Sequence, residues 1–148
     1  MPLDPQCIFC RIVRGEAEAS LVYRDSDVTA FMDLNPITPG HLLIVPNDHF
    51  PDFGSLDPAA GSRMMSVAHQ LARALRRAPL GVEGLNLHLA DGAVAGQVVF
   101  HCHLHIIPRY TGDGFGFRRG ATEHGRDRAE LDRVASLVRS GMADGGEG

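Results

Sequence analysis

The most restrictive feature of the chain is a short segment in which three histidines alternate with other residues. It runs His101-Cys102-His103-Leu104-His105 and is flanked by apolar residues. Alternation with a period of two is typical of a β-strand, so the three imidazoles would share one face and the apolar side chains would pack on the other. Successive histidines would then lie about 6.6 Å apart along the strand. We therefore expect a strand over 98–107 that carries a row of imidazoles.

Two kinds of chemistry fit such a row, beside the simpler reading of hydrogen-bonded histidines on a half-buried face. Two histidines two residues apart on a strand can bind one metal ion with a third ligand from elsewhere. Alternatively, a neutral imidazole nitrogen attacks phosphorus while an acceptor holds the proton on its other nitrogen. The loop 91–97 before the strand favours the second reading, because its backbone amides and the Gln97 side chain offer donors to phosphate oxygens.

The charged residues exclude several other classes of protein. All 14 cationic side chains are arginines, so the chain has no lysine. The absence of lysine excludes Schiff-base enzymes, pyridoxal-phosphate enzymes and P-loop NTPases. A net charge of −4 argues against a nucleic acid polymer as partner, because binding many phosphates needs a basic surface. With neither a long apolar run nor a secretory pattern at the N-terminus, we expect a cytoplasmic protein without a membrane partner.

The pattern along the chain predicts one α+β domain over 1–148, with a core at about 7–110, a C-terminal helix at about 128–140 and a flexible tail at 141–148. Apolar residues at helical spacing predict a short helix at the first cysteines and two main helices, one from Asp57 to about Ala78 and one ending before Gly141. Strands are predicted at 20–24, 28–33, 41–46, 85–90 and 98–107, the first two as a hairpin. Hairpin-like connections between these strands indicate a five-stranded antiparallel sheet.

At the histidine segment the sequence resembles the histidine triad (HIT) family, whose motif is His-φ-His-φ-His-φ-φ with φ apolar. The residues from His101 to Ile107 satisfy the motif, and Ala95-Gly96-Gln97 matches its usual lead-in. The similarity extends to 7–13, 30–33 and 39–46 and covers most of the chain. The resemblance implies a HIT-like fold, usually a homodimer whose two sheets join. It also implies a hydrolase or transferase acting on nucleoside phosphoramidates, acyl nucleotides or dinucleoside polyphosphates.

The resemblance also implies roles for individual residues. His103 matches the nucleophile that forms a nucleotidyl-histidine intermediate, with its protonated nitrogen facing the backbone carbonyl of His101, the first histidine of the triad. His105 matches the residue that contacts the bridging phosphate oxygen, and whether it also protonates the leaving group stays open. Asp33 matches the acceptor of the ribose hydroxyls of a purine nucleotide. The apolar walls of the base pocket and the phosphate loop correspond to Phe9, Ile12, Phe31, Leu34, Gln97 and Val98.

Two positions depart from the family pattern. Val98 replaces the usual Ser or Thr after the Gly-Gln pair, and Ala90 replaces the usual Asn at the start of the loop. Each loss removes a polar contact worth roughly 1.5–3 kcal/mol, so we expect weaker or altered leaving-group selectivity. We expect a nucleoside phosphoramidase, with a dinucleoside polyphosphate hydrolase or a non-catalytic nucleotide-binding protein as the alternatives.

The spacing Cys7-x-x-Cys10 indicates a metal site, since two thiolates in a reducing compartment are half of a tetrahedral zinc set. His49 and His101 are the candidates for the other two ligands, with His41 as a substitute for His49. The set resembles the Cys-Cys-His-His zinc site of some family members. A redox-inert thiol pair is the alternative. No role is assigned to His69, His88 and His124.

Overall fold

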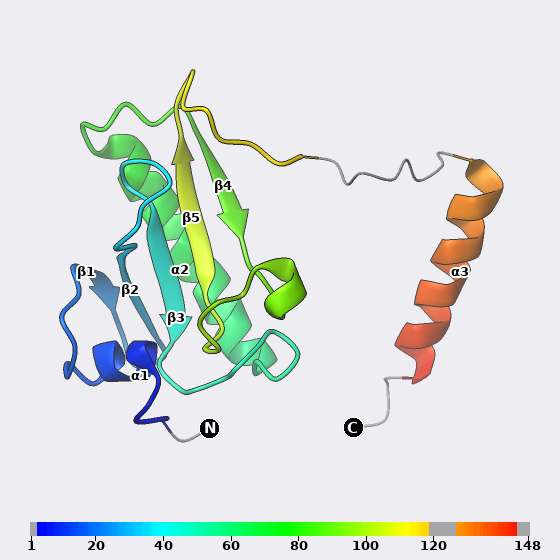
Figure 1. Ribbon diagram of the computed structural model, residues 1–148, viewed down its shortest axis with the longest axis horizontal. Helices are drawn as coiled ribbons and strands as arrows, with labels where there is room; N and C mark the ends of the chain where they lie inside the picture. The colour runs from blue at the N-terminus through cyan, green and yellow to red at the C-terminus, as the bar shows by residue number, and fades with distance from the viewer. Residues whose placement is uncertain (1–2, 119–126, 145–148) are drawn as a thin grey trace. The chain divides into compact units, whose positions relative to one another are not determined.

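The computed structural model of the chain describes residues 3–118 and 127–144. It contains a five-stranded antiparallel sheet with the strand order β1-β2-β3-β5-β4, and the long helix α2 packs on one face of this sheet (Figure 1). The elements in chain order are α1 (Ile8–Val13), β1 (Leu21–Arg24), β2 (Val28–Met32), β3 (Leu42–Pro46), α2 (Pro58–Arg77), β4 (Gly84–His88), the short 3-10 helix η1 (Ala93–Ala95), β5 (Leu104–Arg109) and α3 (Arg128–Asp144). The predicted α+β class and antiparallel sheet are confirmed.

Helix α2 begins and packs as its sequence predicts. The Asp57 carboxylate accepts a hydrogen bond of 2.9 Å from the N–H of Ala59, and Pro58 occupies the first helical position. The buried stripe of the helix covers the sheet face formed by alternate residues of β2, β3 and β5. Its members are Met64, Val67, Ala68, Leu71 and Leu75. Within the described residues, no helix is both long enough and apolar enough to cross a membrane.

The hairpin of β1 and β2 is tied to α2 through one carboxylate. Asp25, in the turn, accepts hydrogen bonds of 2.8 Å from the backbone N–H groups of Asp27 and Val28. It also accepts two bonds from the Arg63 guanidinium on α2, at 2.9 and 2.6 Å, and one from the Tyr23 hydroxyl at 2.8 Å. Asp25 therefore provides acceptors for the backbone N–H groups of the turn and joins the β1–β2 hairpin to α2.

Replacing Asp25 by Asn is expected to destabilise the fold at neutral pH by about 1–2 kcal/mol, allowing for partial exposure of the ion pair. Burial opposes ionisation of Asp25, but the N–H groups of Asp27 and Val28 and the Arg63 guanidinium hold its carboxyl pKa well below the usual range. A depressed pKa stabilises the fold above the unfolded-state pKa, and this stability is lost as the pH falls. Urea unfolding at pH 7 and pH 3 should show a difference between wild type and variant that shrinks in acid. Asp27→Asn is the matched control, and an equal effect of both changes would contradict this account.

Strand β5 begins at Leu104, six residues later than the predicted start at Val98, so the predicted strand over 98–107 is wrong at its N-terminal half. The last pair of the β3–β5 ladder is Ile44 with Leu104. Two residues further along β3 stands Pro46, which has no N–H to donate, and its carbonyl instead accepts a bond of 2.8 Å from the His101 side chain. The ladder therefore stops before the first two histidines of the motif.

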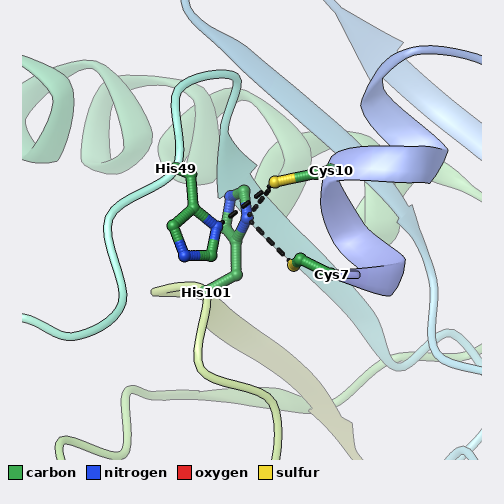
Figure 2. Close-up of side chains that lie close together, drawn as sticks. All are labelled: Cys7, Cys10, His49 and His101. Atoms are coloured by element: carbon green, nitrogen blue, oxygen red, sulfur yellow. Dashed lines mark hydrogen bonds between the residues drawn. The ribbon is translucent and has the colours of Figure 1, made fainter. Parts of the chain in front are cut away.

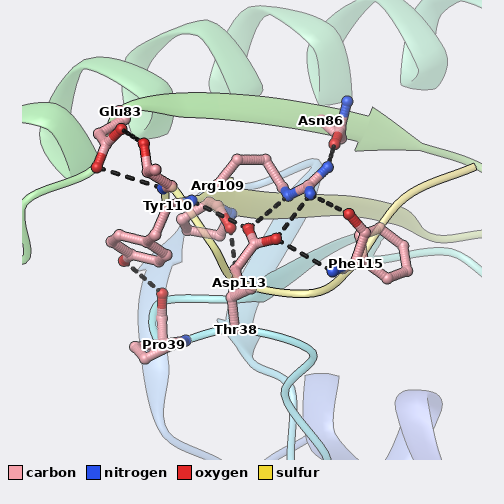
Figure 3. A network of polar contacts seen from close by, with 10 residues as sticks. Thr38, Pro39, Glu83, Asn86, Arg109, Tyr110, Asp113 and Phe115 are labelled. Carbon is pink, nitrogen blue, oxygen red and sulfur yellow. Dashed lines mark hydrogen bonds and ion pairs between the residues drawn. The ribbon is translucent and has the colours of Figure 1, made fainter.

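The far end of β5 is held by an arginine that binds the loop after it. The Arg109 guanidinium donates to both carboxylate oxygens of Asp113, at 2.7 and 2.8 Å, and to the Asn86 side chain of β4 at 2.8 Å (Figure 3). It also donates to the Phe115 carbonyl and lies over the ring of Phe115, 5.0 Å from its centre. This network fixes the loop up to Phe115.

The chain divides into two compact units, the first ending at Phe115 and the second beginning at Gly116. Helix α3 belongs to the second unit. It begins at Arg128 as expected, and the backbone N–H of Leu131 donates to the Asp127 carbonyl at 3.0 Å. The predicted C-terminal helix is thus present.

The end of α3 differs from the prediction. The helix continues through Gly141 to Asp144, so the predicted end near 140 and the stop at Gly141 are wrong. A glycine inside a helix destabilises it by only about 1 kcal/mol relative to alanine, which does not prevent one further turn. Residues 145–148 of the predicted tail lie outside the described residues, and a single domain over 1–148 stays a prediction.

Candidate functional site

The candidate site lies on the face of the sheet opposite to α2, beside the short helix α1. Phe9 of α1 packs edge-on against Phe31 of β2, with ring centres 5.4 Å apart, and against His103, at 5.1 Å. Ile12 joins the same buried apolar cluster. Leu34 is 93% exposed and Val98 is 86% exposed. Of the predicted nucleotide-contacting apolar residues, the structure thus brings Phe9, Ile12 and Phe31 together but leaves Leu34 and Val98 in solvent.

His103 is held in one tautomer by its own chain. Its Nδ1 lies 2.7 Å from the backbone carbonyl oxygen of His101, the arrangement expected from the sequence. A carbonyl oxygen only accepts, so Nδ1 carries the proton and the lone pair is on Nε2. Burial lowers the pKa of His103, which favours the neutral ring. A neutral imidazole with an unprotonated Nε2 is the form that attacks an electrophile.

His105 is oriented by a hydrogen-bonded chain that passes through His41. The backbone N–H of Ile37 donates to Nδ1 of His41 at 3.0 Å, so the neutral ring of His41 carries its proton on Nε2. That Nε2 lies 2.9 Å from Nδ1 of His105, to which it donates. Burial lowers the pKa of both rings, that of His105 to about 4. The proton of neutral His105 therefore sits on Nε2, where it is available as a donor.

The four predicted metal ligands lie close together at the N-terminal end of α1 (Figure 2). Nδ1 of His101 lies 3.6 Å from Sγ of Cys7 and 3.5 Å from Sγ of Cys10, and Nδ1 of His49 lies 3.2 Å from Sγ of Cys10. The candidate ligand atoms all lie within 4.8 Å of one another. His41, the substitute ligand, is not among them.

The protonation of this cluster suits a metal ion. Nε2 of His101 donates to the Pro46 carbonyl, which leaves the lone pair of Nδ1 facing the two sulfurs. Burial is the main reason that the pKa of His101 falls to about 4. Burial also raises the pKa of the Cys10 thiol to about 11, a penalty that a bound cation would remove by stabilising the thiolate. Two thiolates and two imidazoles are a donor set typical of structural zinc.

A second group of three candidate ligands, Asp33, His41 and His105, lies within 4.8 Å of one another. Its protonation does not suit a metal ion, because the Ile37 N–H occupies Nδ1 of His41 and leaves the proton on Nε2, the atom that faces the group. Oδ2 of Asp33 lies 3.4 Å from this Nε2. His41 and His105 are therefore joined by a hydrogen bond beside the Asp33 carboxylate, which disfavours the reading of the histidine row as a catalytic metal site.

Gln97 braces the loop before β5. Its side-chain carbonyl accepts a bond of 2.8 Å from the N–H of Gly92, and its amide donates to the carbonyls of Pro51, at 2.7 Å, and Val99, at 3.1 Å. Only 4% of Gln97 is exposed. Both amide hydrogens are thus used inside the protein, so phosphate contacts from this loop are left to backbone N–H groups.

His88 is a residue that sequence reasoning missed. In the antiparallel register it stands opposite His105 on the neighbouring strand, and the two ring centres are 5.8 Å apart. Residues directly opposite each other in a sheet point to the same face. The sequence does place His88 on a predicted strand. Which residue lies opposite it depends on the register of β4 and β5, and the sequence pattern alone does not give that register.

Comparison with known proteins agrees with the fold and the motif. The HIT domain model matches residues 14–112, and the chain belongs to this family. A relative, the adenylylsulfatase HINT3 of Arabidopsis thaliana, is 36% identical over 136 residues, which are 92% of this chain and 67% of the relative.

Two solved structures are similar over most of the chain. A HIT family protein from Bacillus anthracis has a TM-score of 0.84 and 38% identity, covering 93% of this chain and 97% of its own. A zinc-bound histidine triad family protein from Mycobacterium smegmatis has a TM-score of 0.73 and 38% identity, with the same coverage of 93% and 97%. The chain therefore carries a fold used by nucleotide-processing proteins, together with a Cys₂His₂ cluster.

Proposed function

We propose that the protein is a nucleoside phosphoramidase or a related hydrolase or transferase that works through a nucleotidyl-histidine at His103. The observation that carries this proposal is the hydrogen bond from Nδ1 of His103 to the His101 carbonyl, which leaves Nε2 unprotonated. The adenylylsulfatase among the relatives supports adenylyl conjugates as the substrate class. No lysine is needed, because an imidazole attacks and backbone N–H groups hold the oxygens.

The reaction has two steps. Nε2 of His103 attacks phosphorus in line with the leaving group, the bond from phosphorus to the leaving group breaks, and Nε2–H of His105 donates its proton to the departing atom. Water then attacks phosphorus of the nucleotidyl-histidine, giving its proton back to His105. The phosphorus–nitrogen bond breaks, which releases the nucleoside monophosphate and restores His103.

The nucleoside would lie against α1 and the end of β2. Phe9, Ile12 and Phe31 would form the apolar wall for a purine base. Asp33, whose side chain is 18% exposed, would accept hydrogen bonds from the ribose hydroxyls. Base stacking on an aromatic wall together with a carboxylate for the hydroxyls suits a purine nucleoside.

A zinc ion held by Cys7, Cys10, His49 and His101 would be structural. When bound, it supplies a cross-link between α1 and the segment before β5. The thiols must stay reduced for this purpose, which supports a cytoplasmic location. Strand β4 lies at the edge of the sheet, so a homodimer in which a second copy continues the sheet there is part of the proposal.

The test is to mix the purified protein with adenosine 5′-phosphoramidate and, separately, with adenosine 5′-phosphosulfate, stop the reactions with base and analyse peptides by mass spectrometry. A phosphoramidate bond on histidine survives base and is lost in acid. We expect adenylate on the peptide that contains His103 and release of adenosine monophosphate. Binding of the substrates without turnover or adduct would support a non-catalytic nucleotide-binding protein. Cleavage of diadenosine polyphosphates but of neither test substrate would support a dinucleoside polyphosphate hydrolase.

His41→Phe is expected to lower kcat about 10²-fold, because the chain that keeps the proton of His105 on Nε2 is broken. The loss should be largest for substrates with basic leaving groups, which depend most on protonation. His41→Gln is the conservative variant, since its amide can still donate to His105, and it should retain more activity. Steady-state kinetics on aryl esters of adenosine monophosphate with graded leaving groups measure this dependence. A loss that is uniform across the series would contradict the assignment of His105 as proton donor.

A further inference from the structure

We propose that His88 binds the leaving group and favours substrates whose leaving group is an oxyanion, such as sulfate or phosphate. The inference rests on the proposed function, since it concerns the same site. It assigns a role to a side chain on β4, one strand beyond the histidine motif.

The first support is position. His88 and His105 are paired across β4 and β5, and their rings are 5.8 Å apart at an angle of 45°. The ring of His105 also lies 5.0 Å from that of His103 and 5.2 Å from that of His41. The rings of His103, His105 and His88 therefore form a row of neighbouring imidazoles from the proposed nucleophile to the edge strand β4.

The second support is direction. The apolar wall contacts His103 through Phe9 of α1, whose ring centre is 5.1 Å away, whereas His105, two residues further along the chain, has its ring centre 5.0 Å from that of His103. In an in-line displacement the leaving group departs away from the nucleophile and toward the group that protonates it, which is His105. On the β4 side of His105 the next imidazole is His88. A leaving group that extends beyond its bridging atom would meet this ring.

The third support is chemistry. In either protonation state an imidazole carries at least one N–H, which donates to a non-bridging oxygen of sulfate or phosphate. Ammonia or a small amine as leaving group has no such oxygen. Val98, on the loop, is 86% exposed and offers no side-chain donor. His88 would supply the leaving-group contact that a serine or threonine at position 98 would otherwise make.

The electrostatics of the neighbouring rings are consistent with this closeness. Burial is the main reason that the pKa of His105 falls to about 4, and the neighbouring imidazoles of His103, His41 and, least of the three, His88 act in the same direction. The carboxylate of Asp33 lies on the opposite flank of His105, with Oδ2 4.0 Å from Nδ1. An anion on the His88 side would therefore be separated from that carboxylate by the ring of His105.

The experiment compares one nucleoside with two leaving groups. Adenosine 5′-phosphosulfate releases sulfate and adenosine 5′-phosphoramidate releases ammonia. His88→Leu is expected to lower kcat/KM for the phosphosulfate about 10–100-fold and to leave the phosphoramidate within about threefold of wild type. His88→Gln, which keeps an N–H donor, should recover part of the loss. His69→Leu, on the exposed side of α2, is the control and should change neither rate.

Thermal unfolding and zinc content of each variant separate a folding defect from a local effect, and the ratio of the two rates is insensitive to the fraction of folded enzyme. If the wild type turns over and forms the adduct at His103, but the ratio of kcat/KM for the two substrates is the same in His88→Leu as in wild type, the role of His88 is overturned and the proposed function stands. A wild type that forms no adduct at His103 with either substrate would overturn the proposed function and the inference with it.

Discussion

His103→Ala is expected to reduce turnover of adenosine 5′-phosphoramidate by about four orders of magnitude or more, the scale of loss when a covalent nucleophile is removed. The adenylated peptide should disappear as well. The reason is that Nε2 of His103 is the imidazole nitrogen with a free lone pair next to the apolar wall, while Nε2 of His105 carries a proton. Single-turnover kinetics with labelled substrate and peptide mass spectrometry measure both effects.

The control for this change is His103→Gln, which fills more of the space beside Phe9 than alanine does and should be equally inactive. Both variants should still bind adenosine monophosphate, because Phe31 and Asp33 are intact. Turnover within about tenfold of wild type in either variant, or an adduct that moves to another histidine, would remove His103 from the role of nucleophile.

Loss of the proposed zinc ion is expected to have the largest effect on stability. A ligand present at a thousand times its dissociation constant stabilises the folded state by about 4 kcal/mol, which for a chain of 148 residues corresponds to a shift in Tm of roughly 8–16 °C. Cys10→Ser should therefore bind no zinc, and its Tm should lie below that of the wild type by this amount. Elemental analysis and calorimetry, each with and without chelator, give the two measurements.

Cys102→Ala is the matched control, because Cys102 is also a buried free thiol but packs in the core on the α2 side of the sheet. It should keep its zinc and remain sensitive to chelator, although the smaller side chain lowers its stability. Wild-type protein that is purified without chelators, contains no stoichiometric zinc and melts at the same temperature with chelator would contradict the site.

The candidate metal cluster was predictable because half of it is local in sequence. Cys7 and Cys10 are one helical turn apart, and the resemblance to the HIT family supplied His49 and His101. The structure brings these four residues together and leaves out His41. His41 lies instead beside the histidine row, with its Nε2 2.9 Å from Nδ1 of His105, which agrees with its expected place at the start of a strand.

The histidine strand was predicted with the correct face and the wrong start. Alternation placed His103 and His105 side by side, and their rings are 5.0 Å apart. Alternation carries no information about where a partner strand ends, however, and Pro46 of β3 ends the ladder at Leu104. A strand boundary set by a proline on another strand requires the register before it can be located.

Gln97 and His88 show what a single sequence leaves undetermined. Gln97 was assigned to phosphate, yet its side chain is saturated by Gly92, Pro51 and Val99. His88 was assigned no role, yet it faces His105. Both outcomes depend on contacts between segments far apart in the chain. Leu34, expected in the base pocket, instead projects into solvent from the turn after β2.

The interruption of the sheet at Pro46 has a consequence for how the nucleophile is made available. In a continued antiparallel ladder Pro46 would pair with Cys102, whose N–H instead donates to the Phe50 carbonyl, and the His101 carbonyl would face the β4 edge, where pairing ends at His88 opposite His105. Because the ladder stops, that carbonyl accepts from His103 and the His101 ring binds Pro46 instead. Because β5 pairs with its two neighbouring strands only from Leu104 onward, the backbone before it is available to orient the reacting nitrogen.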